Sequence, residues 1–347
     1  MPPSPNKGKR KADAEEDEKP VDEGAHDKVA AKKPAPGPTT SAKAKAGGAD
    51  SIPRSETPRK PALDAAAKGL RLVHWNVGGL NAVLKSDEKK QRLLSLVAAE
   101  APDVLAISEH KIAEAKLAAA SKELLDVLPG HKAHWAVCTV KNGYSGVVCL
   151  IRNGVEPPES VAIDTVGSLK EGRTVTLEWA DVAAVAAYVP NSGQDLKRLD
   201  HRIQTWEPQM RAHLKAVGEA KGKPVVLFGD LNVAHLDADI WNVTAKHIAK
   251  SAGTTPQERK AFAELLGDGY VDCFRALWPD ATGCFSYWST RSGNQLLNRG
   301  LRLDYAVASA SVLEAKSAVR LHDCAILDEY APNGDHAPTL VVLARSA

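Results

Sequence analysis

The feature that most restricts the fold of this 347-residue chain is a series of short apolar segments that begins at Leu70. Each segment is bounded by turn-forming or charged residues, which is the pattern of a buried β-strand. We predict strands at Leu70–Val77, Asp103–Ile107, Gly146–Arg152, Arg173–Trp179, Val182–Val189, Pro224–Gly229, Asp304–Ser309 and Thr339–Leu343. Because strands outnumber the helical stretches between them, the sequence predicts stacked sheets covered by helices.

Two helices are predicted from periodicity and capping. Within residues 197–218, apolar side chains recur at three- and four-residue steps, as on one face of an amphipathic helix. Further along, Thr255, Pro256 and Glu258 suit the N-cap, the first turn and the capping-box position. We therefore predict a second helix that starts at Thr255 and ends before Gly267.

Residues 1–67 are rich in Lys, Ala, Pro, Glu and Asp and contain no aromatic residue. Such a segment cannot bury enough apolar surface to offset the entropy of ordering, so we predict that it is disordered. Two basic clusters, Lys7–Lys11 and Lys32-Lys33, are compatible with a bipartite nuclear-import signal, which would make an import receptor a partner and the nucleus the location. The alternatives are weak contacts to phosphate and a solvated charged tail.

Charge and cysteine usage restrict the class of protein. The 45 Lys and Arg nearly balance the 43 Asp and Glu, so the net charge of +2 does not by itself indicate nucleic-acid binding. The five cysteines are odd in number and widely spaced, which favours free thiols over disulfides or structural zinc. No apolar run reaches the roughly 18 residues of a membrane helix. We expect a soluble intracellular monomer without a membrane partner.

Polar residues gather where the predicted strands end, which is where a sheet holds a rigid yet accessible site. The stretches are Trp75–Leu80, Ser108–Lys111, Tyr188–Gly193, Gly229–Asn232 and Gly334–His336. Carboxylate, amide and imidazole groups that converge at one edge could hold a hard cation and move protons in phosphodiester cleavage. One motif alone is ordinary turn chemistry, but the ordered set predicts a catalytic site.

In this order and spacing, the motifs resemble the exonuclease III family of apurinic/apyrimidinic endonucleases, within the wider endonuclease/exonuclease/phosphatase superfamily. The resemblance runs from about Leu70 to the C-terminus and implies one catalytic domain, residues 68–347. It implies an α+β fold, a four-layer α-β-β-α sandwich of two packed mixed sheets flanked by helices. It also implies base excision repair by cleavage of double-stranded DNA 5′ to abasic sites, leaving a 3′-hydroxyl and a 5′-deoxyribose phosphate. Additional 3′ exonuclease or 3′ phosphodiesterase activity stays open.

The resemblance assigns a metal site, for magnesium or alternatively manganese. Glu109 is its principal ligand, because a hard cation prefers carboxylate oxygen. Four other residues would lie at or near the metal: Asn76, Asp230, Asn232 and Asp335.

The same resemblance implies the catalytic roles. Asp230, supported by Asn232, would orient or deprotonate the attacking water. His336 would donate to a phosphate oxygen, with its ring held by Asp304. The remaining contacts to the scissile phosphate would come from Tyr188 and Asn191.

Recognition of a missing base needs a small apolar pocket that accepts the extruded sugar but not an intact nucleotide. By resemblance, Tyr287, Trp288 and Leu301 form that pocket, and Leu301 replaces the Trp usual in the family, which leaves more room. The alternative for the two aromatic residues is a place in the core. The other DNA-contacting positions implied by the resemblance are Gln194, Arg291 and Asn242.

Gly78 departs from the family pattern, since family members often carry Asp or Asn near the metal at this position. One oxygen ligand is then absent, and we expect weaker magnesium binding. Two alternative functions stay open: a phosphodiesterase or phosphatase of the same fold acting on another substrate, and a catalytically weakened DNA-binding paralogue. Three stretches that match the abasic-DNA branch argue against the first alternative: Phe285–Ser289, Thr255–Leu266 and Arg302–Tyr305. Against the second, the expected catalytic and metal residues are all present: Glu109, Asp230, Asn232, Asp304 and His336.

Overall fold

The computed structural model describes residues 51–63, 68–167, 169–219, 222–290, 293–331 and 334–346. Sheet 1 contains β1 (Lys68–Asn76), β2 (Val104–Ser108), β3 (His131–Ala136), β4 (Val147–Arg152), β11 (Val319–Ile326) and β12 (Thr339–Arg345). Sheet 2 contains β5 (Ser160–Ile163), β6 (Thr174–Glu178), β7 (Ala183–Tyr188), β8 (Val225–Asp230), β9 (Tyr270–Asp272) and β10 (Asp304–Ser309). The strand orders are β11-β12-β1-β2-β4-β3 and β5-β6-β7-β8-β10-β9. Both sheets are mixed, with parallel pairs β1–β2 and β7–β8, and all eight predicted strands are confirmed.

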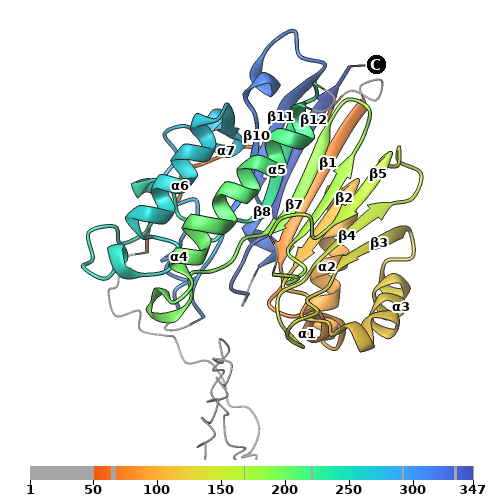
Figure 1. The fold of residues 1–347 in the computed structure, drawn as a ribbon, viewed down its shortest axis with the longest axis horizontal. Helices are drawn as coiled ribbons and strands as arrows, with labels where there is room; N and C mark the ends of the chain where they lie inside the picture. Colours follow the sequence, from red (N-terminus) through yellow and green to blue (C-terminus); the bar gives the residue numbers. More distant parts are fainter. Residues whose placement is uncertain are drawn as a thin grey trace, which may run out of the picture. The chain divides into compact units, whose positions relative to one another are not determined.

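Helices cover the outer faces of both sheets (Figure 1). The α-helices are α1 (Leu80–Leu84), α2 (Asp87–Glu100), α3 (Leu117–Val127), α4 (Leu199–His201), α5 (Glu207–Glu219), α6 (Pro256–Gly267) and α7 (Cys273–Leu277). Short 3-10 turns are η1 (Glu114–Lys116), η2 (Gln194–Leu196), η4 (Asp237–Asp239), η5 (Ile248–Lys250), η6 (Ala310–Leu313) and η7 (Asp328–Tyr330). In the described part of the chain, no helix combines the length and apolar character needed to span a membrane.

Alternate residues along the strands face different layers, as the two-residue period of a strand requires. Leu72 of β1 packs in the core between the sheets, whereas the next residue, Val73, packs against the helices over sheet 1. In sheet 2, Ala186 faces the inter-sheet core and Val185 packs with Trp206 on the helical side. Strands buried on both faces read as nearly continuous apolar runs, which is why the sequence revealed them. The four-layer α-β-β-α sandwich is confirmed.

Both predicted helices are present. Residues 197–218 contain α4 and α5, joined by a π-helical segment, η3 (Arg202–Trp206). The π segment holds a buried Arg202, whose guanidinium donates to the Leu231 and Asn232 carbonyls behind the end of β8. In α6 the capping box is formed, with Thr255 Oγ1 accepting from the Glu258 amide at 3.2 Å.

Four strands were not predicted: β3, β5, β9 and β11. β3 and β5 are edge strands and partly exposed, so polar residues interrupt their apolar pattern. β9 has only three residues. β11 contains a register irregularity between Leu321 and Asp323 that breaks the alternation. Edge position, shortness and a bulge each hide a strand from a pattern-based prediction.

The predicted tail boundary at residue 67 is wrong for residues 51–63, which are ordered against the sandwich. The Ile52 amide donates to the Leu297 carbonyl at 2.9 Å, and Arg59 pairs with Asp323 and Glu100 at 2.7 and 3.0 Å. These partners are remote in sequence, so local composition could not indicate them. Residues 1–50 and 64–67, including both basic clusters, lie outside the described residues.

All five cysteines are buried, and none forms a disulfide, which confirms the prediction of free thiols. Burial raises the pKa of Cys149, Cys273, Cys284 and Cys324 above the ordinary thiol value. The cysteines therefore serve as small apolar core residues.

Candidate active site

The strand register brings three predicted catalytic residues side by side at one edge of sheet 2. Tyr188 ends β7 and pairs with Asp230, which ends β8, while Asp304 begins β10 and pairs with Asp230 from the other side. In sheet 1, Asn76 ends β1 beside Ser108, which ends β2. Because β1 packs on β8, the two edges meet and their polar side chains converge.

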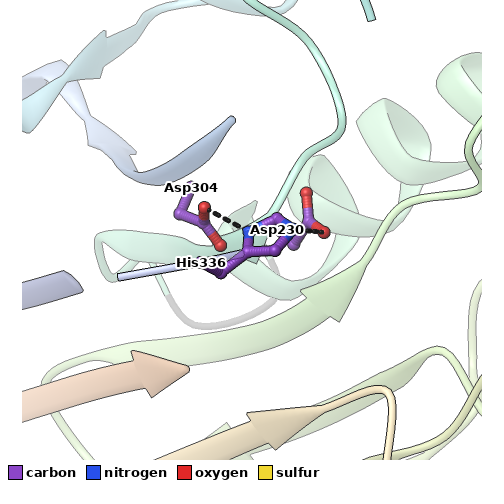
Figure 2. A group of neighbouring side chains, drawn as sticks. All are labelled: Asp230, Asp304 and His336. Atoms are coloured by element: carbon purple, nitrogen blue, oxygen red, sulfur yellow. Dashed lines mark hydrogen bonds and ion pairs between the residues drawn. The ribbon is translucent and has the colours of Figure 1, made fainter. Parts of the chain in front are cut away.

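The imidazole of His336 lies between the carboxylates of Asp304 and Asp230 (Figure 2). Its Nδ1 is 2.8 Å from Asp304 Oδ2, and its Nε2 is 3.8 Å from Asp230 Oδ2. Burial lowers the pKa of His336, but the two carboxylates outweigh burial and raise it well above the ordinary value. Burial also raises the pKa of Asp230, assisted by Asp304 and opposed by His336. His336 and Asp230 therefore form a pair that can hold and release a proton, with the His336 ring anchored by Asp304.

Asn76 joins this unit to Glu109. Its Nδ2 donates to Glu109 Oε1 at 3.0 Å and to Asp230 Oδ2 at 2.9 Å. The Tyr188 hydroxyl donates to the same Glu109 oxygen at 2.7 Å, and Lys111 Nζ lies 2.8 Å from the other. Burial raises the pKa of Glu109, but Lys111 and these hydrogen bonds outweigh it and bring the pKa to about 2. Glu109 is therefore ionised at neutral pH.

Asn232 braces the site rather than extending into it. Its backbone amide donates to Asp230 Oδ1, and its side-chain amide donates to the Val189 carbonyl, both at 2.9 Å. Its own Oδ1 accepts from Asn191 Nδ2 at 2.9 Å. Since that oxygen already has a partner, the geometry favours a positioning role for Asn232 over the metal-ligand role also expected from the sequence.

Unusual backbone conformations gather at the site. Glu109, Lys111 and Asn232 have φ of +53°, +55° and +50°, a region that residues other than glycine rarely adopt. Gly229, just before Asp230, is required for a different reason: a Cβ there would lie 1.9 Å from the Ala187 carbonyl oxygen. Strained residues of this kind persist where surrounding contacts fix them, which is typical of functional sites.

The site offers oxygen and nitrogen donors suited to a metal ion. One ligand atom each from Asp230, Asp304 and His336 lie within 4.8 Å of one another, and Glu109 adds an ionised carboxylate. Asp335, the remaining predicted metal residue, is half-buried beside Gly78, where a Cβ would lie 3.9 Å from Asp335 Oδ1. The donor set fits a hard cation better than a soft one, because carboxylate oxygens predominate.

A pocket of about 140 Å³ lies beside the catalytic residues. Tyr287 forms isolated bridges to both Leu301 and His336, and its ring lies 4.9 Å from the His336 ring. The pocket is lined by both apolar and polar residues: Trp241, Asn242, His247, Ile248, Ser251, Ala252, Thr254, Tyr287, Ser289, Asn294, Arg299, Gly300 and Leu301. Of the predicted DNA-contacting residues, Tyr287, Leu301 and Asn242 therefore share one cavity.

Trp288, the third predicted pocket residue, does not line this cavity. It is 2% exposed, belongs to the inter-sheet core and donates from Nε1 to Asn298 Oδ1 at 3.1 Å. Consecutive residues of an extended chain point to opposite sides, so Trp288 faces inward when Tyr287 faces the pocket. Gln194 is exposed at the start of η2, and Arg291 lies outside the described residues.

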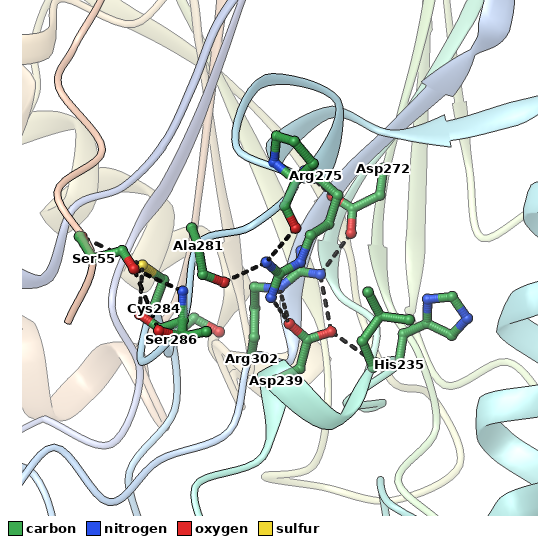
Figure 3. Close-up of polar contacts among 12 residues, drawn as sticks. Ser55, His235, Asp239, Asp272, Arg275, Ala281, Cys284, Ser286 and Arg302 are labelled. Carbon is green, nitrogen blue, oxygen red and sulfur yellow. Dashed lines mark hydrogen bonds and ion pairs between the residues drawn. The ribbon is translucent and has the colours of Figure 1, made fainter. Parts of the chain in front are cut away.

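A buried ion network surrounds Arg302, the residue that follows the pocket residue Leu301 (Figure 3). Arg302, which separates Leu301 from the start of β10, donates to both oxygens of Asp239 at 2.8 and 3.0 Å and to Asp272 at 2.6 Å. Arg275 makes a further bond to Asp239. The network fixes the chain immediately before Asp304, which stands two residues later.

Sequence reasoning left several site residues without a role. Lys111 forms an ion pair with Glu109. The Arg173 guanidinium lies 4.8 Å from the centre of the Tyr188 ring and donates to the Tyr188 carbonyl. Ser286 donates to Asp304 Oδ2 at 2.8 Å. Lys111 and Ser286 fall inside stretches that the sequence singled out, whereas nothing local indicated Arg173.

Two packed sheets with a carboxylate and imidazole centre at their strand ends suit an enzyme that hydrolyses phosphate esters. A model of the endonuclease/exonuclease/phosphatase family matches residues 73–327, and the chain belongs to that family. Within the family it is of the exonuclease III type.

Curated relatives and solved structures agree. The chain is 38% identical to the DNA repair nuclease APEX1 of Danio rerio, over 81% of this chain and 84% of that one. It is 34% identical to an exodeoxyribonuclease of Bacillus subtilis, over 79% of this chain and 99% of that one. The crystal structure of an AP endonuclease from Leishmania major is similar with a TM-score of 0.70 and 28% identity, covering 86% of this chain and 94% of that one.

Proposed function

We propose that this protein is a DNA repair endonuclease that hydrolyses the backbone 5′ to abasic sites in double-stranded DNA. The observation that carries the proposal is the pocket of about 140 Å³ with Tyr287 beside the imidazole of His336. A cavity of roughly 150 Å³ accommodates a benzene-sized group, so a bare deoxyribose fits where a complete nucleotide does not. The names of the Danio rerio and Bacillus subtilis relatives support a nuclease that acts on DNA.

The chain's own residues divide the chemistry between them. Asp230, whose pKa is raised by burial, is suited to accept the proton of the attacking water, and the Asn232 amide fixes the direction of its carboxylate. The protonated His336 neutralises charge on the phosphate, held in place by Asp304. Tyr188 and Asn191 stand at the same edge, and we assign them to the phosphate's remaining oxygens.

We also propose magnesium as the metal, with manganese as a substitute. Glu109 would be its main ligand, with Asp230, Asn76 and Asp335 nearest to it, because the donors are mostly oxygen. The ion would supply positive charge to the pentacovalent phosphate and the leaving oxygen. Gly78 contributes no side-chain oxygen of its own, which supports weaker magnesium binding than in relatives with Asp or Asn at this position.

The test uses the full chain, magnesium and a duplex with one tetrahydrofuran abasic analogue, beside the same duplex with an intact base. Cleavage 5′ to the analogue only is expected, with a 3′-hydroxyl that a polymerase extends. An uncut analogue duplex at saturating protein and magnesium would refute the proposal. Release of inorganic phosphate from 3′-phosphate ends without incision would instead support the same-fold phosphatase alternative.

Removing the charge of Glu109 should raise the magnesium requirement. For Glu109→Gln we expect the magnesium concentration for half-maximal rate to rise by about 10-fold or more, since losing even an indirect metal contact costs that much. The measurement is a magnesium titration of the cleavage rate at saturating DNA. Glu123→Gln, an exposed glutamate of α3, is the matched control and should leave the midpoint unchanged. Coinciding midpoints for Glu109→Gln and wild type would remove Glu109 from the metal site.

For the N-terminal residues we propose nuclear import through the clusters Lys7–Lys11 and Lys32-Lys33. What supports the proposal is that both clusters are rich in lysine and arginine, as nuclear-import signals are. Replacing both clusters with alanine in a fluorescent fusion should shift the protein out of the nucleus. Unchanged nuclear fluorescence would show that the clusters are not an import signal.

A further inference from the structure

His74 is a buried histidine that the roles assigned above leave unused. It lies in β1, two residues before Asn76, with 0% of its surface exposed. Its Nε2 is 2.9 Å from Ser108 Oγ, but its Nδ1 has no hydrogen-bond partner. That Nδ1 lies 3.5 Å from Asp304 Oδ1. A polar atom buried without a partner is costly and needs an explanation.

Asp304 presents the matching unpaired atom. Its Oδ2 accepts from His336 Nδ1 and from Ser286 Oγ, each at 2.8 Å, whereas its Oδ1 is buried without a hydrogen-bond partner. The unpaired atoms of His74 and Asp304 face each other, and a small closure would pair both. Hydrogen bonds in catalytic sites are often long in the free enzyme and shorten when substrate binds.

Only one tautomer of His74 suits these surroundings. With the proton on Nε2, the Nδ1 lone pair would face the Asp304 oxygen and repel it. With the proton on Nδ1, His74 donates to Asp304 while its Nε2 accepts from the Ser108 hydroxyl.

We propose that His74 is a positioning residue that orients His336 through Asp304. A chain of contacts runs from Ser108 through His74 to Asp304 and His336, and closing the 3.5 Å gap between His74 Nδ1 and Asp304 Oδ1 would hold both oxygens of the Asp304 carboxylate. A carboxylate held at only one oxygen can turn about its side-chain bond and take the imidazole with it. With both oxygens fixed, the His336 ring keeps its direction toward Asp230.

The first test needs no substrate. In ¹⁵N-histidine NMR spectra of the full chain, we expect a neutral His74 with its proton on Nδ1 and a slowly exchanging ring N–H, identified by its loss in His74→Asn. A His74 ring protonated on Nε2 would overturn the proposal. This readout stands whether or not the protein cuts abasic DNA.

The second test rests on the proposed function and compares two substitutions of His74. His74→Phe keeps a ring without the donor, and we expect kcat to fall about 10- to 100-fold with KM unchanged. His74→Asn keeps an N–H near the position of Nδ1 and should recover most of the rate. His213→Phe, which removes a partly buried histidine bonded to Thr176, is the control for general destabilisation and should keep wild-type kcat.

A double-mutant cycle separates positioning from general disturbance. Because His74 acts through Asp304, His74→Phe should have no further effect on kcat in the Asp304→Asn background. Additive losses, wild-type kcat in His74→Phe, or equal losses in His74→Phe and His74→Asn would each overturn the proposal. If His74→Phe does not fold, Ser108→Ala takes its place, and the expected result is a smaller loss of kcat with a mixed His74 tautomer. A wild-type enzyme that leaves abasic DNA intact contradicts the proposed function and leaves the NMR test of His74 in force.

Discussion

Asp230→Asn should lower kcat for abasic-site cleavage by about 10²- to 10⁴-fold, the contribution typical of a general base, while DNA binding is retained. The amide keeps the shape of the carboxylate, but it has a single acceptor oxygen and can accept from only one of Asn76 Nδ2 and the Asn232 backbone amide, and it cannot take up a proton. Single-turnover cleavage and binding of the analogue duplex in calcium, measured on the same preparation, separate the two effects.

The same substitution should not destabilise the protein. The folded protein raises the pKa of Asp230, so above the ordinary carboxylate pKa its buried charge opposes folding, and a neutral amide removes that cost. We expect the melting temperature of Asp230→Asn to equal or exceed that of the wild type at pH 7.5. Asp126→Asn, an exposed residue of α3, controls for charge removal. Near-wild-type kcat in Asp230→Asn would exclude Asp230 as the base, and loss of DNA binding would show that its role is structural.

Arg302→Met should lower the free energy of unfolding by about 3–5 kcal/mol, because it leaves buried carboxylates without their counter-charge. Arg302 is 1% exposed, pairs with Asp239 and Asp272, and lies 4.3 Å from the Tyr305 ring centre. Urea denaturation followed by tryptophan fluorescence measures the change, and cleavage below the transition shows whether the pocket also loosens.

Arg211→Met is the matched control for Arg302→Met. Arg211 also pairs with two carboxylates, Asp268 and Glu264, but at the surface between α5 and α6. We expect a loss below about 1 kcal/mol for this exposed network. Similar losses for the two variants would mean that burial adds nothing to the Arg302 network.

The sequence predicted best what depends on local pattern. The strands buried on both faces appear in the sequence as apolar runs. The polar residues at the ends of three of these strands meet because β7, β8 and β10 are neighbours in the sheet, which pairs Asp230 with Tyr188 and Asp304. The capping box of α6 needs only residues three apart, Thr255 and Glu258, so it too was visible.

What depends on distant partners could not be predicted. Residues 51–63 contain few apolar side chains, and their order comes from contacts such as Arg59 with Asp323, 264 residues away. Asp323 in turn breaks the apolar pattern of β11, and it is buried in an ion pair with Arg59. The placement of Trp288 was predictable in principle, since the alternation that puts Tyr287 in the pocket turns Trp288 inward.

The burial of the five cysteines has a practical consequence. A thiol-specific reagent needs an accessible thiolate, and the native fold offers neither access nor a lowered pKa at Cys149, Cys273 or Cys324. The rate at which such a reagent labels the protein therefore reports how often the fold opens locally around each cysteine. Cys149 and Cys324 belong to sheet 1 and Cys273 to α7, so the protein carries an intrinsic gauge of which part of the sandwich opens first.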